Sequence, residues 1–332
     1  MVALSRTEDQ LAAALKVVEE SDASVIEKAE MLMEIAMGLQ QRPKEADDLL
    51  AAIELYEQAI HQCGDQDALL TARIRARMAT ALMAIPSEIA APIEQARDLL
   101  KQATPVLAEG GSGEEVAEAE MNLGLALQTL AGAGMARITD AISAYQRSLR
   151  TFNKLRHPRE YAILNNNLAT AFLSVPITSD SGKISEALAV QSFEEGLSAV
   201  NLIDQPMEYA MLQNNLGNAL QYASSSHRVE NGFRALEAYD EALKVRQRDN
   251  TPLEYANTIA NKANCLCNLP DDPQDGEAGN PRNIAQAIKL LREAREIFAA
   301  AGAQDRAESA AQTIIELEMA VRGEPSRANG GF

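Results

Sequence analysis

The chain of 332 residues contains no tryptophan, only 4% aromatic residues, three cysteines and three histidines. An odd and sparse set of cysteines does not provide a disulfide framework. Basic residues are scarce as well, because 30 Lys and Arg stand against 48 Asp and Glu, which gives a formal net charge of −18. Nucleic-acid binders and proteins that bind anionic membranes need a basic surface, so the composition argues against both classes.

Long apolar runs are also missing. The first 20 residues carry acidic side chains where a signal peptide needs an unbroken apolar core. No stretch approaches the roughly 18 uncharged apolar residues that a membrane span requires. We therefore expect a cytoplasmic protein that has no membrane-spanning helix.

The few chemically reactive residues form no recognisable catalytic or metal-binding pattern. Cys265 and Cys267 are two positions apart, so on a helix their side chains point in different directions. His61 and Cys63 lack a second ligand pair at zinc-site spacing, and no histidine is placed to activate a serine or a cysteine. The glycine-rich "EGGSGEE" lacks the lysine of a phosphate-binding loop. We predict no catalytic residue, no metal and no cofactor, and we do not expect an enzyme.

What the chain does contain is an internal repeat. "PREYAILNNNLATAF" starts at Pro158, "PMEYAMLQNNLGNAL" at Pro206 and "PLEYANTIANKANCL" at Pro252. Proline is tolerated at the first position of a helix, and a glutamate in the first turn interacts favourably with the helix dipole. We predict that a helix begins at each of these three prolines.

Each copy can be numbered from the alanine that follows the tyrosine position, which we call offset 1. These alanines are Ala72, Ala117, Ala162, Ala210, Ala256 and Ala307, so successive copies lie 45 to 51 residues apart. Offset 8 is small in the middle copies (Ala79, Gly124, Ala169, Gly217, Ala263), and offset 11 is bulky (Leu82, Leu127, Phe172, Leu220, Leu266). A first copy is expected near Ile26, with Glu27 at offset 1 and Leu32 at offset 6.

A second pattern, with the order small, bulky, small, follows each of these segments. Its instances are Ala52-Tyr56-Ala59, Ala96-Leu100-Ala103, Ala141-Tyr145-Ser148, Ala189-Phe193-Gly196, Ala235-Tyr239-Ala242 and Ala287-Leu291-Ala294. Spacings of four and three residues place all three members on one face of a helix. Each copy is therefore predicted to be a pair of closely packed helices that stacks on the next pair.

Together, the two patterns resemble the tetratricopeptide repeat (TPR), and the "NNL(A/G)" core is similar to the repeats of kinesin light chain and related bacterial proteins. The resemblance covers residues 24–323. It implies an all-α, right-handed α-solenoid of about six TPR-like helix pairs with a C-terminal capping helix. Residues 1–23 are expected to form an N-terminal capping helix, and 324–332 a disordered tail. Because a standard repeat has about 34 residues, the helices or the loops must be longer here.

The resemblance also implies that offsets 2, 5, 6 and 9 of each first helix face a concave groove. An asparagine amide offers donors and an acceptor, so it can pair with the backbone of an extended peptide. The alternative for offset 5, which holds Asn166 and Asn214, is packing within the repeats. The predicted peptide-binding residues are Arg73, Arg77, Asn122, Asn166, Asn167, Thr170, Asn214, Asn215, Asn218, Asn257, Asn261 and Asn264.

Arg73 and Arg77 are four residues apart and share a helical face. They could clamp a carboxylate of the ligand. Alternatively, they balance nearby acidic residues, and Glu118 is a candidate for an internal partner.

We predict a non-catalytic protein–protein interaction module, such as an adaptor, an assembly chaperone or a regulator, that binds a peptide segment of a partner in the groove. Two alternatives stay open. The chain could be a structural subunit of a larger complex or homo-oligomer whose groove is incidental, or a TPR sensor that responds to a small molecule.

Overall fold

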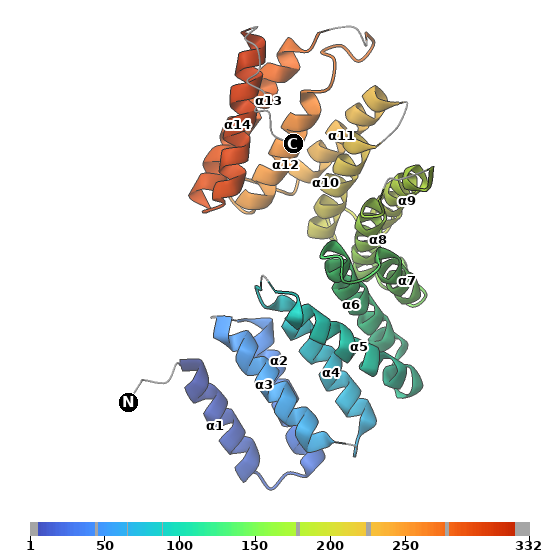
Figure 1. Ribbon diagram of the computed structural model, residues 1–332, viewed down its shortest axis with the longest axis vertical. Coiled ribbons are helices and arrows are strands. Elements are labelled where there is room, and N and C mark those ends of the chain that lie inside the picture. Colours follow the sequence, from blue (N-terminus) through green and yellow to red (C-terminus); the bar gives the residue numbers. More distant parts are fainter. Residues whose placement is uncertain are drawn as a thin grey trace. The chain divides into compact units, whose positions relative to one another are not determined.

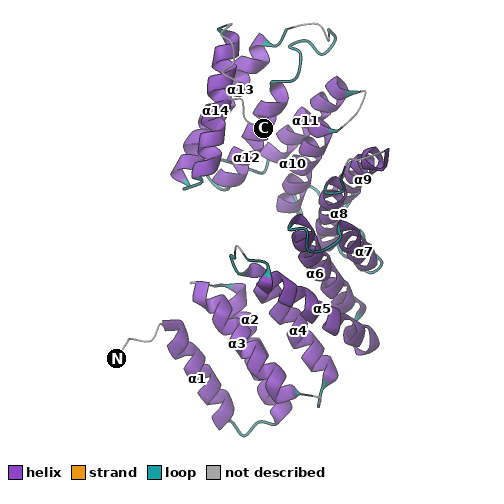
Figure 2. Cartoon of the chain, in the orientation of Figure 1, coloured by secondary structure: helices purple, strands orange, loops and turns teal. Residues whose placement is uncertain are grey.

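The computed structural model describes residues 6–43, 46–64, 66–87, 89–176, 180–223, 227–275 and 279–322. Every regular element in these ranges is a helix, and none of these residues forms a strand (Figure 2). The all-α fold class is therefore confirmed. The C-terminal segment 324–332, which the sequence predicts to be a disordered tail, lies outside the described residues.

Fourteen helices occur in the described part of the chain, and Figure 1 shows them in sequence order. They are α1 (Arg6–Glu20), α2 (Val25–Gln41), α3 (Ala46–Cys63), α4 (Ala68–Ala84), α5 (Ala91–Gly110), α6 (Gly113–Gly132), α7 (Ile138–Ser148), α8 (Pro158–Leu173), α9 (Asp180–Leu197), α10 (Pro206–Tyr222), α11 (Arg228–Leu243), α12 (Pro252–Leu266), α13 (Pro281–Ala300) and α14 (Gln304–Val321).

The helices pack in consecutive pairs. The pairs are α2 with α3, α4 with α5, α6 with α7, α8 with α9, α10 with α11, and α12 with α13. Helix α1 precedes the six pairs and contacts α2 and α3, while α14 follows them and contacts α13. The predicted α-solenoid of helix pairs is thus confirmed, and the fourteen helices of the described residues amount to about seven pairs.

The chain forms two compact units. The N-terminal unit comprises residues 1–153 with helices α1–α7, and the C-terminal unit comprises residues 154–332 with helices α8–α14. Within each unit the pairs stack, because α3 contacts α4 and α5 contacts α6 in the first, while α9 contacts α10 and α11 contacts α12 in the second.

Much of the extra length of the repeat lies in its helices. Helix α4 has 17 residues and α5 has 20, and these two helices alone exceed the roughly 34 residues of a standard repeat. The long loop between α12 and α13 adds further length, and two asparagines at the start of α13 bond carbonyls at the beginning of this loop. Asn280 Nδ2 donates to the Cys267 carbonyl at 2.8 Å, and Asn283 Nδ2 donates to the Leu269 carbonyl at 3.0 Å.

The predicted small–bulky–small triplets form the core of each helix pair. All of their members are buried, from Ala52, Tyr56 and Ala59 in α3 to the corresponding residues of α13. Where the bulky residue is a tyrosine in α7 or α11, offset 8 of the preceding helix is a glycine. A Cβ at Gly124 would lie 2.5 Å from the Tyr145 ring, and one at Gly217 would lie 2.6 Å from the Tyr239 ring. Because glycine has no Cβ, each tyrosine ring can pack directly against the backbone of the preceding helix.

The repeated P-x-E-Y-A segment has a structural role in the C-terminal unit. Pro158, Pro206 and Pro252 each occupy the first position of their helices, as predicted. The tyrosine hydroxyl then bonds a glutamate of the second helix in the same pair. Tyr209, for example, donates to Glu241 at 2.9 Å, and Tyr161 and Tyr255 make the corresponding bonds to α9 and α13.

The predicted register of the first copy is wrong by two residues. Helix α2 buries Ala29, Leu32 and Ala36, whereas Glu34, which the prediction puts at offset 8, is exposed. Ala29 therefore occupies offset 1, and Leu32 is a core residue that does not face a groove. The small, fully buried residues Ala29 and Ala36, and not Glu27, mark the packed face of α2.

Candidate functional site

The predicted groove positions, offsets 2, 5, 6 and 9 of the first helices, define what we call the first-helix face. In the N-terminal unit it is formed by α2, α4 and α6, and in the C-terminal unit by α8, α10 and α12. Neighbouring first helices are in contact within each unit, α4 with α2 and α6, and α10 with α8 and α12. Side chains at these offsets can therefore meet from one repeat to the next.

In the C-terminal unit, five asparagines of this face form a continuous chain of hydrogen bonds, which we call the amide row. Asn261 Nδ2 donates to Asn214 Oδ1 at 3.3 Å, and Asn214 Nδ2 donates to Asn215 Oδ1 at 3.0 Å. Asn215 Nδ2 then donates to Asn166 Oδ1 at 2.7 Å, and Asn166 Nδ2 donates to Asn167 Oδ1 at 3.2 Å. The row links α12, α10 and α8.

The row separates two kinds of asparagine. Asn166 and Asn214, at offset 5, are buried, with 8% and 7% of their surface exposed. Asn167, Asn215 and Asn261, at offset 6, are partly exposed. The buried amides hold the exposed ones by their bonds, and each exposed amide keeps unused donor or acceptor capacity for a further partner.

All bonds of the amide row run in the same direction. Each amide that accepts a bond at its oxygen donates the next bond from its nitrogen, and bonds arranged in this way polarise one another. Within the described residues, the row ends on an Asn167 amide nitrogen and an Asn261 amide oxygen, neither of which is used inside the row. It therefore presents a donor at α8 and an acceptor at α12.

A charged side chain supports the α12 end of the row. Arg246 donates to Thr258 Oγ1 at 2.8 Å, and the Thr258 hydroxyl lies 3.1 Å from Asn214 Oδ1 and 2.9 Å from the Glu254 carbonyl. Burial lowers the pKa of the Arg246 guanidinium, and the charge of Glu254 opposes this shift. Because arginine remains protonated and can only donate, Thr258 accepts from it and has its own proton to donate, either to Asn214 Oδ1 or to the Glu254 carbonyl.

The other predicted residues of the C-terminal unit lie beside the row. The Thr170 hydroxyl donates to the Asn167 carbonyl at 2.9 Å, and Asn218 Oδ1 accepts from the Tyr239 hydroxyl at 2.8 Å. Asn257 Oδ1 accepts from Arg306 at 3.2 Å. Asn257, Asn261 and Asn264 also line an open hollow of about 290 Å³ between α12 and α14.

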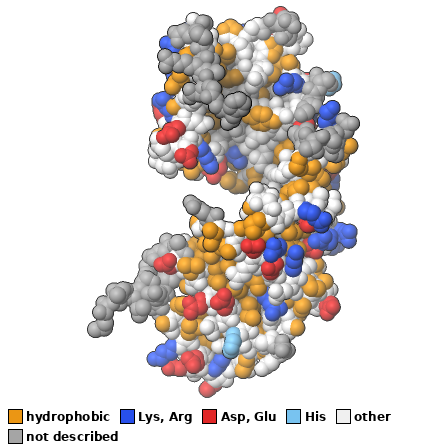
Figure 3. Space-filling view, viewed as in Figure 1, with side chains coloured by type: hydrophobic (Ala, Val, Ile, Leu, Met, Phe, Trp, Pro, Cys, Tyr) orange, Lys and Arg blue, Asp and Glu red, His pale blue; other side chains and the backbone are white. Residues whose placement is uncertain are grey.

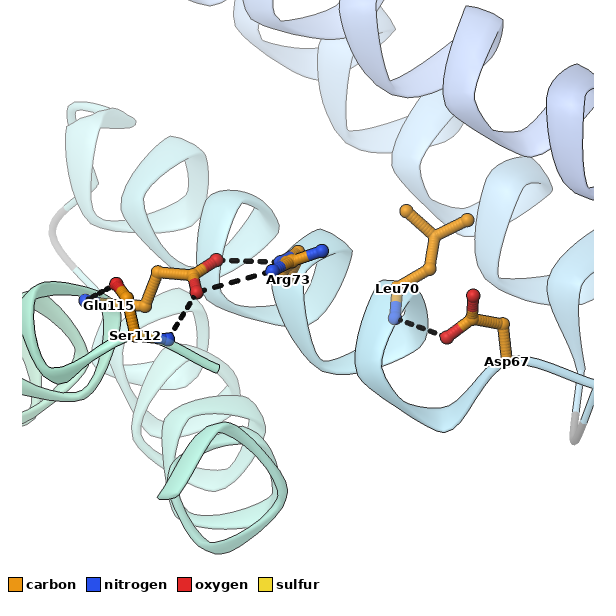
Figure 4. A network of polar contacts seen from close by, with 5 residues as sticks. All are labelled: Asp67, Leu70, Arg73, Ser112 and Glu115. Carbon is orange, nitrogen blue, oxygen red and sulfur yellow. Dashed lines mark hydrogen bonds and ion pairs between the residues drawn. The ribbon is translucent and has the colours of Figure 1, made fainter. Parts of the chain in front are cut away.

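The first-helix face of the N-terminal unit is charged instead. Arg73 Nε donates to Glu115 Oε1 at 2.6 Å, and Arg73 Nη2 donates to Glu115 Oε2 at 3.3 Å (Figure 4). Glu115 also caps α6, because its Oε2 accepts from the Ser112 N–H at 2.8 Å. The Arg73 guanidinium, and after it the Ser112 N–H, hold the pKa of the Glu115 carboxyl below its usual value.

Arg77 lies one turn further along α4, and its guanidinium is 3.7 Å from the Glu118 carboxylate. Both predicted arginines thus have internal carboxylate partners on α6. With Asn122, they line a pocket of about 190 Å³ formed mainly by α2, α4 and α6. Figure 3 shows acidic and hydrophobic side chains intermixed on the visible face of this unit.

Sequence reasoning missed Arg246 and Thr258, although the repeat contains a signal for them. Aligned on the helix-starting prolines, Arg246 takes the place of Phe152 and Val200, and Thr258 takes that of Leu164 and Leu212. All four of those apolar counterparts are buried. A paired change from two apolar residues to two polar ones predicts that the new residues bond one another.

Two kinds of feature are missing from the described residues. No helix among them is long and apolar enough to cross a bilayer. Among the same residues, no group of three or more His, Cys, Asp or Glu side chains is arranged to hold a metal ion.

No family model and no curated protein sequence matches the chain. Among solved structures, the apo form of the quorum sensor NprR from B. thuringiensis is similar, with a TM-score of 0.51 and 13% sequence identity over 94% of this chain and 81% of that chain. Rap protein complexed with Competence and Sporulation Factor gives a TM-score of 0.43 at 12% identity, over 95% and 81% of the two chains. The TPR2AB domain of yeast Sti1 in a pHSP90 complex gives 0.29 at 16%, over 87% and 98%. The chain has a TPR-type helical-repeat fold.

Proposed function

We propose that the chain is a non-catalytic interaction module that binds an extended peptide segment of a partner protein along the first-helix face of its C-terminal unit. The amide row is the observation that carries this proposal. Asn167, Asn215 and Asn261 are the ligand contacts, and Asn166 and Asn214 support them from below. Thr170, Asn218, Asn257 and Asn264 border the row, and Arg73, Arg77 and Asn122 belong to the matching face of the N-terminal unit.

The chemistry of the row suits a peptide backbone. An extended peptide presents N–H and C=O groups at regular spacing, and each partly exposed asparagine can offer both an acceptor and a donor. No charged residue stands at offsets 2, 5, 6 or 9 of α8, α10 and α12, so a neutral backbone meets no unpaired charge there. The internal bonds of the row fix the amides before the ligand arrives, which lowers the entropy cost of binding.

The test begins with a displayed library of random peptides selected against the whole protein. An enriched peptide is then synthesised and its affinity measured by fluorescence polarisation. We expect that replacing Asn167, Asn215 and Asn261 by alanine weakens binding by about 100-fold, since each lost hydrogen bond contributes about 1 kcal/mol. Asn250, an exposed asparagine outside the face, provides the control variant Asn250→Ala, which should bind as the wild type does.

A second measurement asks whether the backbone is what the amides recognise. Methylating single backbone nitrogens of the peptide should abolish binding at the positions that face the row, while most of its side chains tolerate alanine. Circular dichroism establishes that the triple variant is still helical. If the helical triple variant keeps full affinity, the row is a packing feature and the peptide-binding proposal is wrong.

A further inference from the structure

The pocket on the first-helix face of the N-terminal unit has the size of a single side chain. Its volume is about 190 Å³. This is slightly more than the roughly 150 Å³ of an engineered apolar cavity that holds benzene. It is well below the roughly 300–1,000 Å³ of pockets that take drug-sized ligands. The pocket therefore suits one side chain of a polypeptide better than a whole metabolite.

Much of the lining is apolar and adaptable. Met33 and Met37 come from α2, Ala76 from α4 and Leu107 from α5. Methionine is unbranched and polarisable, so a pair of methionines can close around an aliphatic chain of variable course. An unbranched hydrocarbon stem fits such a wall.

The charges around the pocket are unequal. Arg73 is bonded to Glu115, and Arg77 is paired with Glu118, so these two pairs are neutral as units. Glu34, on α2, also lines the pocket. Within the described part of the chain, no lysine, arginine or histidine forms a salt bridge with Glu34, which leaves one uncompensated negative charge beside an apolar lining.

We propose that this pocket binds a lysine side chain of a partner protein, with the hydrocarbon stem between Met33 and Met37 and the ammonium group at Glu34. Lysine combines a flexible four-carbon stem with a compact charge, and it places the stem on apolar surface while the ammonium group stays near water. The net charge of −18 attracts a basic segment at long range. This site is separate from the amide row and does not depend on the proposed function of that row.

The test uses the whole protein with 13C-labelled methionine methyl groups. The Met33 and Met37 signals are assigned by Met→Leu substitution. The probe is N-acetyl-lysine N-methylamide, and N-acetyl-norleucine N-methylamide supplies the same stem without the charge. We expect the lysine probe to shift both methyl signals in a saturable manner, and the norleucine probe to bind more weakly.

Charge variants make the test decisive. Glu34→Gln keeps the shape of the pocket and should weaken the lysine probe by about fivefold, the range of a partly exposed ion pair. Glu57→Gln makes the same change at an exposed position of α3, outside the pocket lining, and should leave the affinity unchanged. Equal binding of both probes, an unaffected Glu34→Gln variant, or equal shifts with N-acetyl-glutamate N-methylamide would overturn the proposal. Asn215→Ala should not affect this titration, so the outcome is independent of the amide row.

Discussion

The two units carry the same repeat but present different chemistry at the same offsets. In the N-terminal unit, offsets 2 and 6 of α4 hold Arg73 and Arg77, which pair with carboxylates of α6. In the C-terminal unit, the corresponding positions of α8 hold Ile163 and Asn167, and the bonds between first helices at offsets 5 and 6 are amide to amide. An ion pair between Arg159 of α8 and Glu208 of α10 lies nearer the start of these helices. The repeat thus fixes where side chains point, while the residue types decide which ligand the face can take.

The two faces also differ in how firmly they are held. The Arg77–Glu118 pair is about half exposed and 3.7 Å apart, so water and salt screen it. The amide row is anchored by two buried asparagines and by the fully buried Thr258. We therefore expect the stability of the amide row and that of the charged pocket to respond differently to mutation, pH and salt.

The largest expected effect comes from breaking the polar anchor of the row. Thr258→Leu installs the residue found at this position in α10 but leaves the Arg246 guanidinium without its acceptor. We expect a loss of about 2–3 kcal/mol in the free energy of unfolding, the cost of leaving a partly buried charged donor without its bond. Urea unfolding measures this loss.

A second substitution, taken from the preceding copy of the repeat, should restore the stability lost in Thr258→Leu. The double variant Arg246→Val, Thr258→Leu reproduces the apolar pair Val200 and Leu212 of the preceding repeat, both of which are buried. It should recover most of the lost stability, because replacing both polar partners by apolar ones is nearly neutral. Additive losses in the double variant would show that the two residues do not act as a pair.

The next prediction compares a buried asparagine of the row with a partly exposed one. Asn214 bonds Asn215, Thr258 and Asn261, so Asn214→Ala removes the junction of the network. It should lower the unfolding free energy by about 1–2 kcal/mol. Asn167→Ala removes only the end of the row and should cost less than about 0.5 kcal/mol. Similar losses in both thermal-unfolding experiments would contradict the division into buried and exposed amides.

A smaller effect on stability is expected at the Arg73–Glu115 pair, and it should depend on pH. Glu115→Gln removes the charge but keeps a side chain that can cap α6. Because Arg73 and Glu115 are partly exposed, the loss at pH 7 should be about 0.5–1 kcal/mol. The folded pKa of Glu115 is depressed, so its contribution is present above the unfolded value and disappears as the pH falls through the folded value.

Wild type and Glu115→Gln should therefore converge in stability as the pH is lowered from about 4.5 through the depressed pKa of Glu115. Urea titrations of both proteins at several pH values measure the convergence. A constant difference down to the lowest pH would mean that the Arg73 contact does not depend on the charge of Glu115.

The smallest effect concerns Arg77. Arg77→Asn gives α4 the offset-6 residue of α8 and removes a pair that is 3.7 Å apart and about half exposed. The change in unfolding free energy should stay below about 0.5 kcal/mol. The same variant frees Glu118 and makes the pocket more negative, so the lysine probe should bind more tightly. Weaker probe binding would mean that Arg77 shapes the pocket more than it compensates its charge.

Most of the fold could be predicted from the sequence. The prolines gave the starts of α8, α10 and α12, and the small–bulky–small triplets gave the buried faces of the second helices. These features are local, because they depend on residues within one or two turns of each other. The register of α2 was predicted wrongly, since its correct alignment depends on contacts with α3 that the spacing of one helix does not contain.

The candidate site was only partly predictable. The offsets identified which asparagines share a face, and the sequence left open whether Asn166 and Asn214 serve ligand contact or packing. In the structure both are buried, and their amides bond other asparagines of the row. The two arginines were candidates for a ligand clamp, and in the structure their nearest carboxylates are internal.

The sequence by itself determined the helix pairs and their period, because these follow from helical geometry and from the need to bury apolar faces. The direction in which offsets 2, 5, 6 and 9 point is what the resemblance to the TPR implies. Only the tertiary structure decided which polar side chains bond each other. The bonds from Arg73 to Glu115, from Asn261 to Asn214 and from Asn215 to Asn166 join residues that lie 42 to 49 positions apart in the chain. Such bonds exist only once neighbouring repeats have stacked and brought side chains of different helices within about 3 Å.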